Sequence, residues 1–369
     1  MPGARLAREG RSLEEAPCWR LWRVLWRAAV GLAIAAATGE LICRQIYFGP
    51  KVFDPELGLV FAPAATVVTR IEGAAESHWS EHGVRRSSKA GPSVERPILV
   101  IGDSFTEALQ VGDDFVYTAQ LEQQLSHVGM ERPILNVAES GNSLADYVAN
   151  AAFFRKTFHP AWTVVQIGEL DCGKEAWDAT GAAFTRDVAG GAVGIRKAVP
   201  LDPEERGWLR RFVHQARNRS ALVAYSFKRS LDFANAWRAD PPMFNASRAV
   251  PRDRAQPPDN YPLELELQML VEAYAGRLTI HYTTPFYAPP RAAVPSQTDA
   301  RVEAFARSNR ISFVKLGDMY RRLATENIAA SGFANTSPFK GHWNESGHKE
   351  VARLLAAELG RIASTNGIF

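Results

Sequence analysis

From residue 96 onward, short apolar runs alternate with stretches in which apolar residues recur at helical spacing. Short apolar runs bounded by Gly or Pro are typical of buried strands, and a period of about 3.6 residues is typical of amphipathic helices. We predict strands over 97–101, 134–138, 162–168, 278–283 and 311–315, and helices over 117–127, 144–158, 264–275, 299–308 and 350–364. This alternation indicates βαβ units, and therefore an α/β fold: a three-layer α/β/α sandwich with a central, mostly parallel sheet of about five strands.

Two stretches do not follow this alternation. Residues 44–92 contain only short apolar pieces and end in a polar SSKAGPS run, so we expect an irregular lead-in segment there, not a separate domain. The main domain then extends over 93–369. Within it, residues 178–260 combine a Gly/Ala-rich stretch, a basic helix-like run and a Pro-rich segment, and we interpret them as an insertion or cap over the sheet.

The amino-terminal region predicts an export signal or a membrane anchor. Residues 1–20 form a basic segment, and the segment 21–43 is apolar, with no charge between 28 and 39. A membrane-spanning helix needs about 20 apolar residues, whereas a signal-peptide core needs about 7 to 15. We favour a retained transmembrane signal anchor over 21–43, with a cleaved signal peptide and a buried helix of a cytosolic protein as alternatives. The Arg excess before the segment predicts a cytoplasmic start and an exported remainder.

Composition narrows the functional classes. Hydrophobic residues make up 46% and charged residues 22% of the chain, which excludes a wholly disordered or polytopic membrane protein. Beyond residue 27 the basic and acidic side chains are equal in number, so no nucleic-acid-binding surface is predicted. The 3 cysteines include no CxxC pair, and His348 follows His342 at a spacing that does not make a metal pair. We therefore predict no metal and no cofactor.

Three short motifs carry candidate chemistry. Ser104, in ILVIGDSFTEAL, directly follows the first predicted strand, where a helix start can supply N–H donors for an oxyanion. Gly141, in NVAESGNS, follows the second strand, and a glycine lets the backbone approach a ligand closely. His342, in GHWNESGHKEVARLL, precedes the last helix and can act as a general base. Each residue alone has an ordinary structural explanation, but their order at the strand ends of one sheet points to a catalytic serine.

These blocks resemble those of the SGNH/GDSL hydrolase family, whose fold is flavodoxin-like. The resemblance covers about residues 96–361 without the middle insertion, and the lead-in, with FDPELGLVFAP and EHGVR, is similar to that of membrane-anchored bacterial members. The resemblance implies that Ser104 is the nucleophile and His342 the base, and that the N–H groups of Ser104 and Gly141 form the oxyanion hole. Three further polar residues are candidates for supporting roles: Asp103, Asn142 and Asp171.

Two positions depart from the family's pattern. Leu170, in IGELD, stands where an Asn usually adds an oxyanion donor, and Phe339 stands where the acid that orients the histidine usually lies. In serine proteases, the loss of one such donor costs about 10² to 10³ in rate, and the loss of the acid costs about 10⁴. His342 would then act in a Ser-His dyad, or be oriented by a backbone carbonyl, by Asp103 or by Asp171.

Three functional hypotheses follow from the resemblance. The first is a serine esterase that removes small acyl groups, expected to be acetyl, from an envelope or extracellular carbohydrate. The second is an O-acyltransferase of the same fold that modifies a polysaccharide, with polysaccharide-assembly proteins as partners. The third, motivated by Leu170 and Phe339, is a catalytically inactive carbohydrate-binding or scaffold subunit. The implied location is the bacterial inner membrane, crossed once, with the main domain on the periplasmic or extracytoplasmic side.

Overall fold

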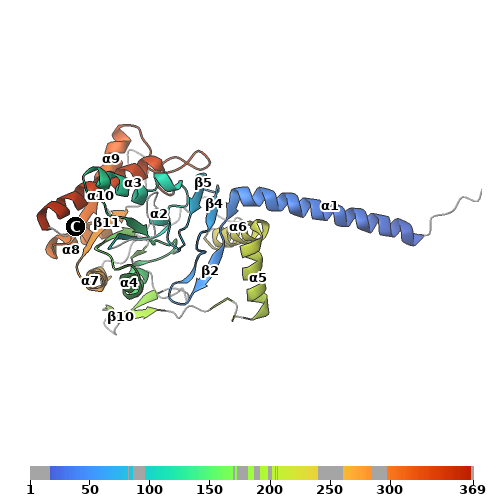
Figure 1. The fold of residues 1–369 in the computed structure, drawn as a ribbon, viewed down its shortest axis with the longest axis horizontal. Helices are drawn as coiled ribbons and strands as arrows, with labels where there is room; N and C mark the ends of the chain where they lie inside the picture. The colour runs from blue at the N-terminus through green and yellow to red at the C-terminus, as the bar shows by residue number, and fades with distance from the viewer. Residues whose placement is uncertain are drawn as a thin grey trace, which may run out of the picture.

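The computed structural model describes residues 17–81, 83–85, 96–168, 171–172, 182–186, 192–197, 202–203, 205, 207–239, 261–283 and 297–366. In these residues the chain forms one main body and a long helix that projects from it (Figure 1).

A five-stranded parallel sheet lies at the centre of the main body (Figure 1). The strand order is β12-β11-β8-β6-β7. Nearly every residue of the sheet is buried, as expected for a parallel sheet covered on both faces. The predicted α/β fold with about five mostly parallel strands is confirmed. The strands are β6 (Ile98–Ile101), β7 (Ile134–Asn136), β8 (Trp162–Gly168), β11 (Leu278–Thr283) and β12 (Ser312–Lys315).

Helices cover both faces of this sheet. Successive residues of a strand point to opposite faces, so both faces present apolar side chains to the helices. In β8, Val165 and Ile167 pack in one apolar cluster, and Trp162 and Val164 pack in the other. The first cluster includes residues of α4 (Leu144–Phe158), α7 (Leu263–Ala273) and α8 (Gln297–Ser308). The second includes residues of α3 (Tyr117–His127), α9 (Gly317–Thr325) and α10 (Glu345–Asn366).

The lead-in segment is not irregular, and our prediction for it was wrong. β1 (Tyr47–Phe48), β4 (Thr66–Thr69) and β5 (Ala75–His78) form an antiparallel sheet, and β2 (Lys51–Asp54) pairs with β3 (Gly58–Phe61) as a hairpin. These strands have only 2 to 4 residues, so they lack the longer alternation by which a strand is recognised in a sequence. An isolated bridge between Arg85 and Asn136 joins the segment to the edge strand β7.

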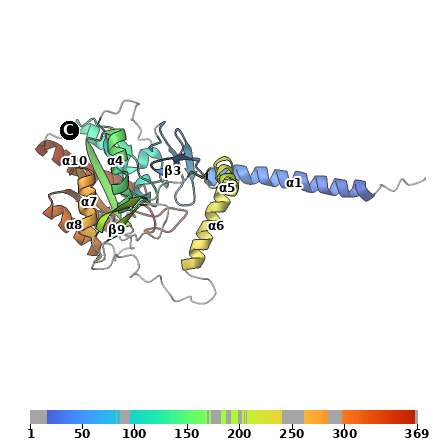
Figure 2. The same cartoon turned by 90° about the horizontal axis from the view of Figure 1, so that it is seen from below.

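The projecting helix is α1 (Pro17–Ile46). Its residues Trp19–Ile46 are long and apolar enough to cross a membrane, and an 18-residue window within them has a mean hydropathy of 1.4 and no buried residue. Cys43, near the inner end of α1, is buried. A signal sequence near the amino terminus has the same properties. Figures 1 and 2 show that α1 leaves the main body on one side and contacts it only at its inner end.

Four elements of the region 178–260 are described. β9 (Ala182–Arg186) pairs with β10 (Ala192–Lys197) in a hairpin that contacts α4. α5 (Trp208–Arg219) and α6 (Ala221–Ala239) contact each other, and α6 also contacts α1 and β1. The Pro-rich segment lies outside the described residues.

Candidate active site

Ser104 begins the short helix α2 (Ser104–Glu107), directly after β6. The turn is fixed by Asp103, whose side-chain Oδ1 accepts a hydrogen bond from the backbone N–H of Phe105 at 2.8 Å. The backbone N–H of Asp103 donates in turn to Gln166 Oε1 of β8 at 2.9 Å. The serine is therefore held on a turn that is hydrogen-bonded to the central sheet, and it remains partly exposed.

A serine, a histidine and a carboxylate form one chain of hydrogen bonds. His342 Nε2 lies 2.8 Å from Ser104 Oγ, and His342 Nδ1 lies 2.6 Å from Glu72 Oε2. The other carboxylate oxygen of Glu72 accepts from the backbone N–H of His342 at 2.8 Å. The position of Glu72, in the lead-in segment between β4 and β5, corrects our expectation of a dyad, a backbone carbonyl, Asp103 or Asp171 as the partner of His342.

This geometry assigns the protons. An ionised carboxylate only accepts hydrogen bonds, so Nδ1 carries the proton that faces Glu72, and Nε2 is left to accept the proton of the Ser104 hydroxyl. Burial acts to raise the pKa of Glu72, but the hydrogen bonds from His342 and its charge outweigh burial and hold the pKa of Glu72 below its usual value. Glu72 is therefore ionised at neutral pH.

Two residues on the histidine loop keep Glu72 in place. Gly341, at φ +81°, has no Cβ, and a Cβ at this position would overlap Glu72 Oε1. Asn335 binds the turn that carries Glu72: its Oδ1 accepts from the N–H of Gly73 at 3.0 Å, and its Nδ2 donates to the carbonyls of Arg70 at 3.0 Å and Gly73 at 2.7 Å. The lead-in turn and the histidine loop are thus bonded to each other on both sides of the carboxylate.

Gly141 lies in the loop between β7 and α4, with a φ of +92° that favours glycine. The N–H of Glu139 in this loop donates to the carbonyl of Gly102, two residues before the serine, at 3.3 Å. Ser140 is bonded to α2, because its N–H donates to Glu107 Oε2 at 3.1 Å and its hydroxyl contacts the same oxygen. The loop that carries Gly141 is therefore bonded to the helix that carries Ser104.

The three supporting candidates lie near the site but do not contact His342 Nδ1. Asp103 caps α2, and burial, the largest influence on it, raises its pKa. Asp171 Oδ2 accepts from the N–H of Gly168 at 2.6 Å and from the Tyr147 hydroxyl at 3.3 Å, so it stabilises the end of β8. Asn142 bonds through its N–H to the carbonyl of Glu139 at 3.2 Å. Leu170, the position that departs from the family's oxyanion donor, lies outside the described residues.

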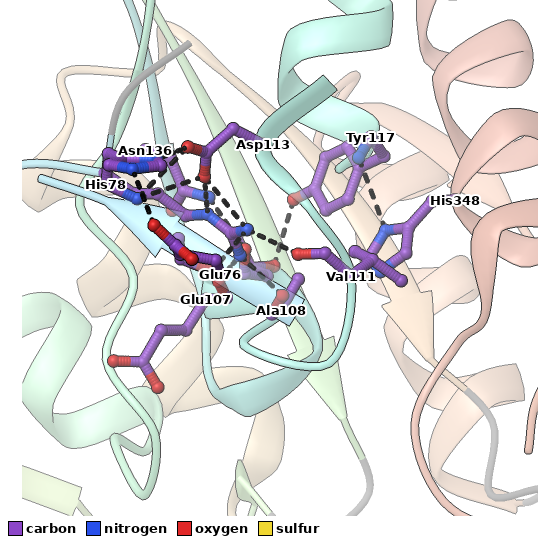
Figure 3. A network of polar contacts seen from close by, with 12 residues as sticks. Glu76, His78, Glu107, Ala108, Val111, Asp113, Tyr117, Asn136 and His348 are labelled. Atoms are coloured by element: carbon purple, nitrogen blue, oxygen red, sulfur yellow. Dashed lines mark hydrogen bonds and ion pairs between the residues drawn. The ribbon is translucent and has the colours of Figure 1, made fainter. Parts of the chain in front are cut away.

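Behind α2 lies a buried polar network centred on Arg85, which is 2% exposed. Its guanidinium donates to the carbonyls of Glu107 and Ala108 at the end of α2 and, at 2.7 Å, to the carbonyl of Val111. It also pairs with Asp113 at 3.2 Å. Figure 3 shows how these acceptors converge. Arg85 thus supplies the donors that the last carbonyls of a helix lack.

Aromatic side chains pack around His342 and the residues that follow it. The Phe105 ring lies 4.9 Å from the His342 ring, and it also contacts Trp343. Tyr117 stacks on His348, whose Nδ1 accepts from the Tyr117 N–H at 3.3 Å (Figure 3). Burial lowers the pKa of His348 to about 3, so this histidine is neutral and has a structural role.

A cavity of about 690 Å³ lies beside the Gly141 loop, between the β2–β3 hairpin and the sheet edge. Its walls are mainly apolar and include Glu139 and Asn142 of that loop. Neither Ser104 nor His342 lines it. Among the described residues, no group of three or more His, Cys, Asp or Glu is arranged to hold a metal ion.

No family model and no curated protein matches the sequence. The distantly similar solved structures include three that each have a TM-score of 0.38. TesA is 13% identical and covers 72% of this chain and 99% of its own. Axe2, an acetylxylan esterase from Geobacillus stearothermophilus, is 18% identical and covers 72% and 96%. A two-domain esterase active on acetylated mannans is 10% identical over 73% of this chain and 50% of its own. At these values the likeness carries no function over to this chain.

Proposed function

We propose that this chain is a serine hydrolase that cleaves esters of small acyl groups. Ser104 is the nucleophile, His342 the general base, and Glu72 the acid that orients His342. The observation that supports this assignment is the continuous chain of hydrogen bonds through the three side chains, 2.6 Å and 2.8 Å long. It has the order of donors and acceptors that activates a serine hydroxyl.

In the proposed reaction, Ser104 Oγ attacks the ester carbonyl while its proton passes to His342 Nε2. The resulting oxyanion accepts hydrogen bonds from the N–H groups of Ser104 and Gly141. His342 then gives the proton to the leaving alkoxide, and an acyl-serine remains. Water, deprotonated by the same histidine, releases the acid and restores the serine. Glu72 stabilises the imidazolium that forms in both steps.

The substrate and the location are also part of the proposal. The motif resemblance favours acetyl groups on an envelope or extracellular carbohydrate. α1 would be retained as the anchor in the bacterial inner membrane, with the span over 21–43 and the main domain over 93–369 outside the cytoplasm. The lead-in over 44–92 would belong to the catalytic unit, because it supplies Glu72.

The two alternatives receive less support. Leu170 and Phe339 motivated an inactive subunit. Glu72 supplies the carboxylate that Phe339 does not, and Leu170 lies outside the described residues. Acyl transfer to a polysaccharide uses the same covalent serine, and no contact in the described part of the chain favours a sugar acceptor over water.

Covalent labelling by a fluorophosphonate tests the nucleophile. We expect the folded full chain to be labelled at Ser104, as located by peptide mass spectrometry, and Ser104→Ala to remain unlabelled. Ser364→Ala, at an exposed serine near the end of α10, should label like the parent. Failure of the folded parent to label at Ser104 would contradict the proposal.

A further inference from the structure

Helix α5 exposes large apolar side chains in its first turns. Trp208, Leu209 and Phe212 are 79%, 56% and 64% exposed. Since an α-helix turns by about 100° per residue, these three side chains share one side of the helix, which we call the outer face of α5. Clustered exposed apolar groups of this size mark an interaction surface more often than an ordinary soluble surface.

The opposite side of α5 packs on the main body. Asn218 Nδ2 donates to the carbonyl of Lys51 in β2 at 2.6 Å, and Asn218 Oδ1 accepts from the Lys51 N–H at 3.1 Å. The Arg217 guanidinium lies 4.2 Å from the ring centroid of Phe227 in α6. At about 100° per residue, Arg217 lies opposite Trp208 and Asn218 lies opposite Leu209, so both are far from the middle of the outer face. One side of α5 is therefore fixed, and its outer face is left exposed.

The junction between α5 and α6 is bonded to α1. Glu40 of α1 accepts from the Ser220 hydroxyl at 2.7 Å and from the N–H groups of Ala221 and Leu222 at 2.9 Å and 3.0 Å, at the start of α6. Arg44 donates to the carbonyl of Arg219, at the end of α5, at 2.9 Å. Glu40 is the first charged residue after the uncharged stretch 28–39. The junction between α5 and α6 therefore contacts α1 at the end of that uncharged stretch.

The outer face of α5 points in the direction in which α1 extends away from the main body. Figures 1 and 2 show α5 and α6 lying across the axis of α1, at the end where α1 joins the main body. In Figure 1, β2 lies on the body side of α5, so the face opposite to β2 looks toward the side along which α1 extends. A membrane crossed by α1 would have its surface there.

The charge of this region fits an anionic surface. Residues 208–239 hold 7 Lys or Arg side chains and 1 Asp, whereas basic and acidic side chains are balanced over the chain beyond residue 27. A helix with basic and aromatic side chains is suited to the interface of a membrane, because Lys and Arg side chains are attracted to an anionic lipid surface.

We propose that the outer face of α5 binds the headgroup layer of the anionic bilayer that α1 crosses. The inference rests on the anchoring proposed above and not on the hydrolase chemistry. Attachment through both α1 and α5 fixes the orientation of the main body relative to the lipid surface, which a single spanning helix does not do.

The test uses the full chain, reconstituted in vesicles of phosphatidylcholine and phosphatidylglycerol. An environment-sensitive fluorophore is attached to the thiol introduced by Phe212→Cys. Cys18→Ser removes the thiol of Cys18, and the two other cysteines, Cys43 and Cys172, are buried. The matched control carries the fluorophore through Val128→Cys, at a residue that is 70% exposed at the end of α3. We expect a blue-shifted emission and quenching by spin-labelled lipid at position 212, and neither at position 128.

Equal quenching at the two positions would overturn the docking of α5. If quenching at position 212 is as strong in vesicles of pure phosphatidylcholine as in vesicles that contain phosphatidylglycerol, the role of anionic lipid is overturned. A chain that does not float with the vesicles would overturn the anchor and the docking together. Ester turnover by the same samples keeps the proposals apart: turnover without quenching contradicts only the docking, and quenching without turnover contradicts only the hydrolase.

Discussion

Glu72 fixes His342 in two ways, because one carboxylate oxygen binds the imidazole and the other binds the backbone N–H of the same residue. The backbone contact places the histidine loop, and the side-chain contact selects the tautomer whose Nε2 accepts the proton of Ser104. A carboxylate with a lowered pKa does both without becoming protonated in neutral solution.

We predict that Glu72→Gln lowers kcat by about 10³ to 10⁴ with little change in KM, because the amide keeps the size of the side chain but loses the charge that stabilises the imidazolium. Steady-state kinetics on a chromogenic acetate ester measures this effect. Glu76→Gln is the matched control, since Glu76 lies in the same segment, is more than half exposed and pairs only with His78 among the ion pairs described. A Glu72→Gln variant with near-parent kcat would contradict the triad.

Asn335 should act through Glu72. Asn335→Ala removes three hydrogen bonds and frees the turn at Gly73. We expect kcat to fall by about tenfold, which corresponds to the net free energy of roughly one to two hydrogen bonds. Added to Glu72→Gln, the same change should have little further effect, because residues that act as one unit are not additive. Asn309→Ala, which also removes an amide bonded to a backbone carbonyl, is the control. Full additivity of the two changes would contradict a positioning role.

Part of this site could be predicted from the sequence. Ser104, Gly141 and His342 each lie close to the end of a recognisable strand or to the start of a helix, and their order resembles that of a known family. Glu72 could not be found in this way, because it lies 270 residues before its partner. Sequence patterns indicate a partner only within a few residues of the histidine or on neighbouring strand-end loops, and no local pattern indicates a pairing across such a separation.

At the scale of elements, the lead-in strands and the main sheet form one site. Strands β4 and β5 carry Glu72 between them, and Arg85 follows β5 and binds the end of α2. The strands of the main sheet were predicted because they are apolar runs bounded by turn residues. The lead-in strands were missed because each is stabilised mainly by pairing with its neighbour, which a short sequence window does not show.

Arg85→Met should lower the free energy of unfolding by about 3 to 5 kcal/mol, because it leaves the buried carbonyls at the end of α2 without their donor and takes one partner from the partly buried Asp113. Chemical unfolding of the detergent-solubilised chain measures this difference. Asp113→Asn, added to Arg85→Met, should restore part of the loss by removing a carboxylate that has lost its guanidinium partner. Arg277→Met, at an exposed arginine between α7 and β11, should have little effect. A loss as small as that of Arg277→Met would show that the network does not stabilise α2.

At the scale of the whole molecule, the buried histidines make stability dependent on pH. Burial lowers the pKa of both His281 and His348 to about 3. An unfolded histidine has a pKa of about 6.5, so between pH 6.5 and pH 3 the unfolded chain binds more protons than the folded chain. Stability is therefore fully present above the unfolded pKa and is lost as the pH falls below it.

We predict that His348→Gln weakens this pH dependence, by up to about 1.4 kcal/mol per pH unit between pH 6 and pH 4. The free energy of unfolding, measured across this range, provides the comparison. His127→Gln, at an exposed histidine at the end of α3, should leave the slope as it is. An unchanged slope in His348→Gln would mean that His348 is charged in the folded chain.

Ser104, His342 and Glu72 should work together as a catalytic triad. Turnover of p-nitrophenyl acetate by the full chain, beside Ser104→Ala and Glu72→Gln, measures this cooperation. We expect turnover in the parent, loss to the background rate in Ser104→Ala, and a small residual rate in Glu72→Gln. Parent-like turnover in Ser104→Ala, or a folded parent that turns over neither this ester nor an acetylated oligosaccharide, would contradict it.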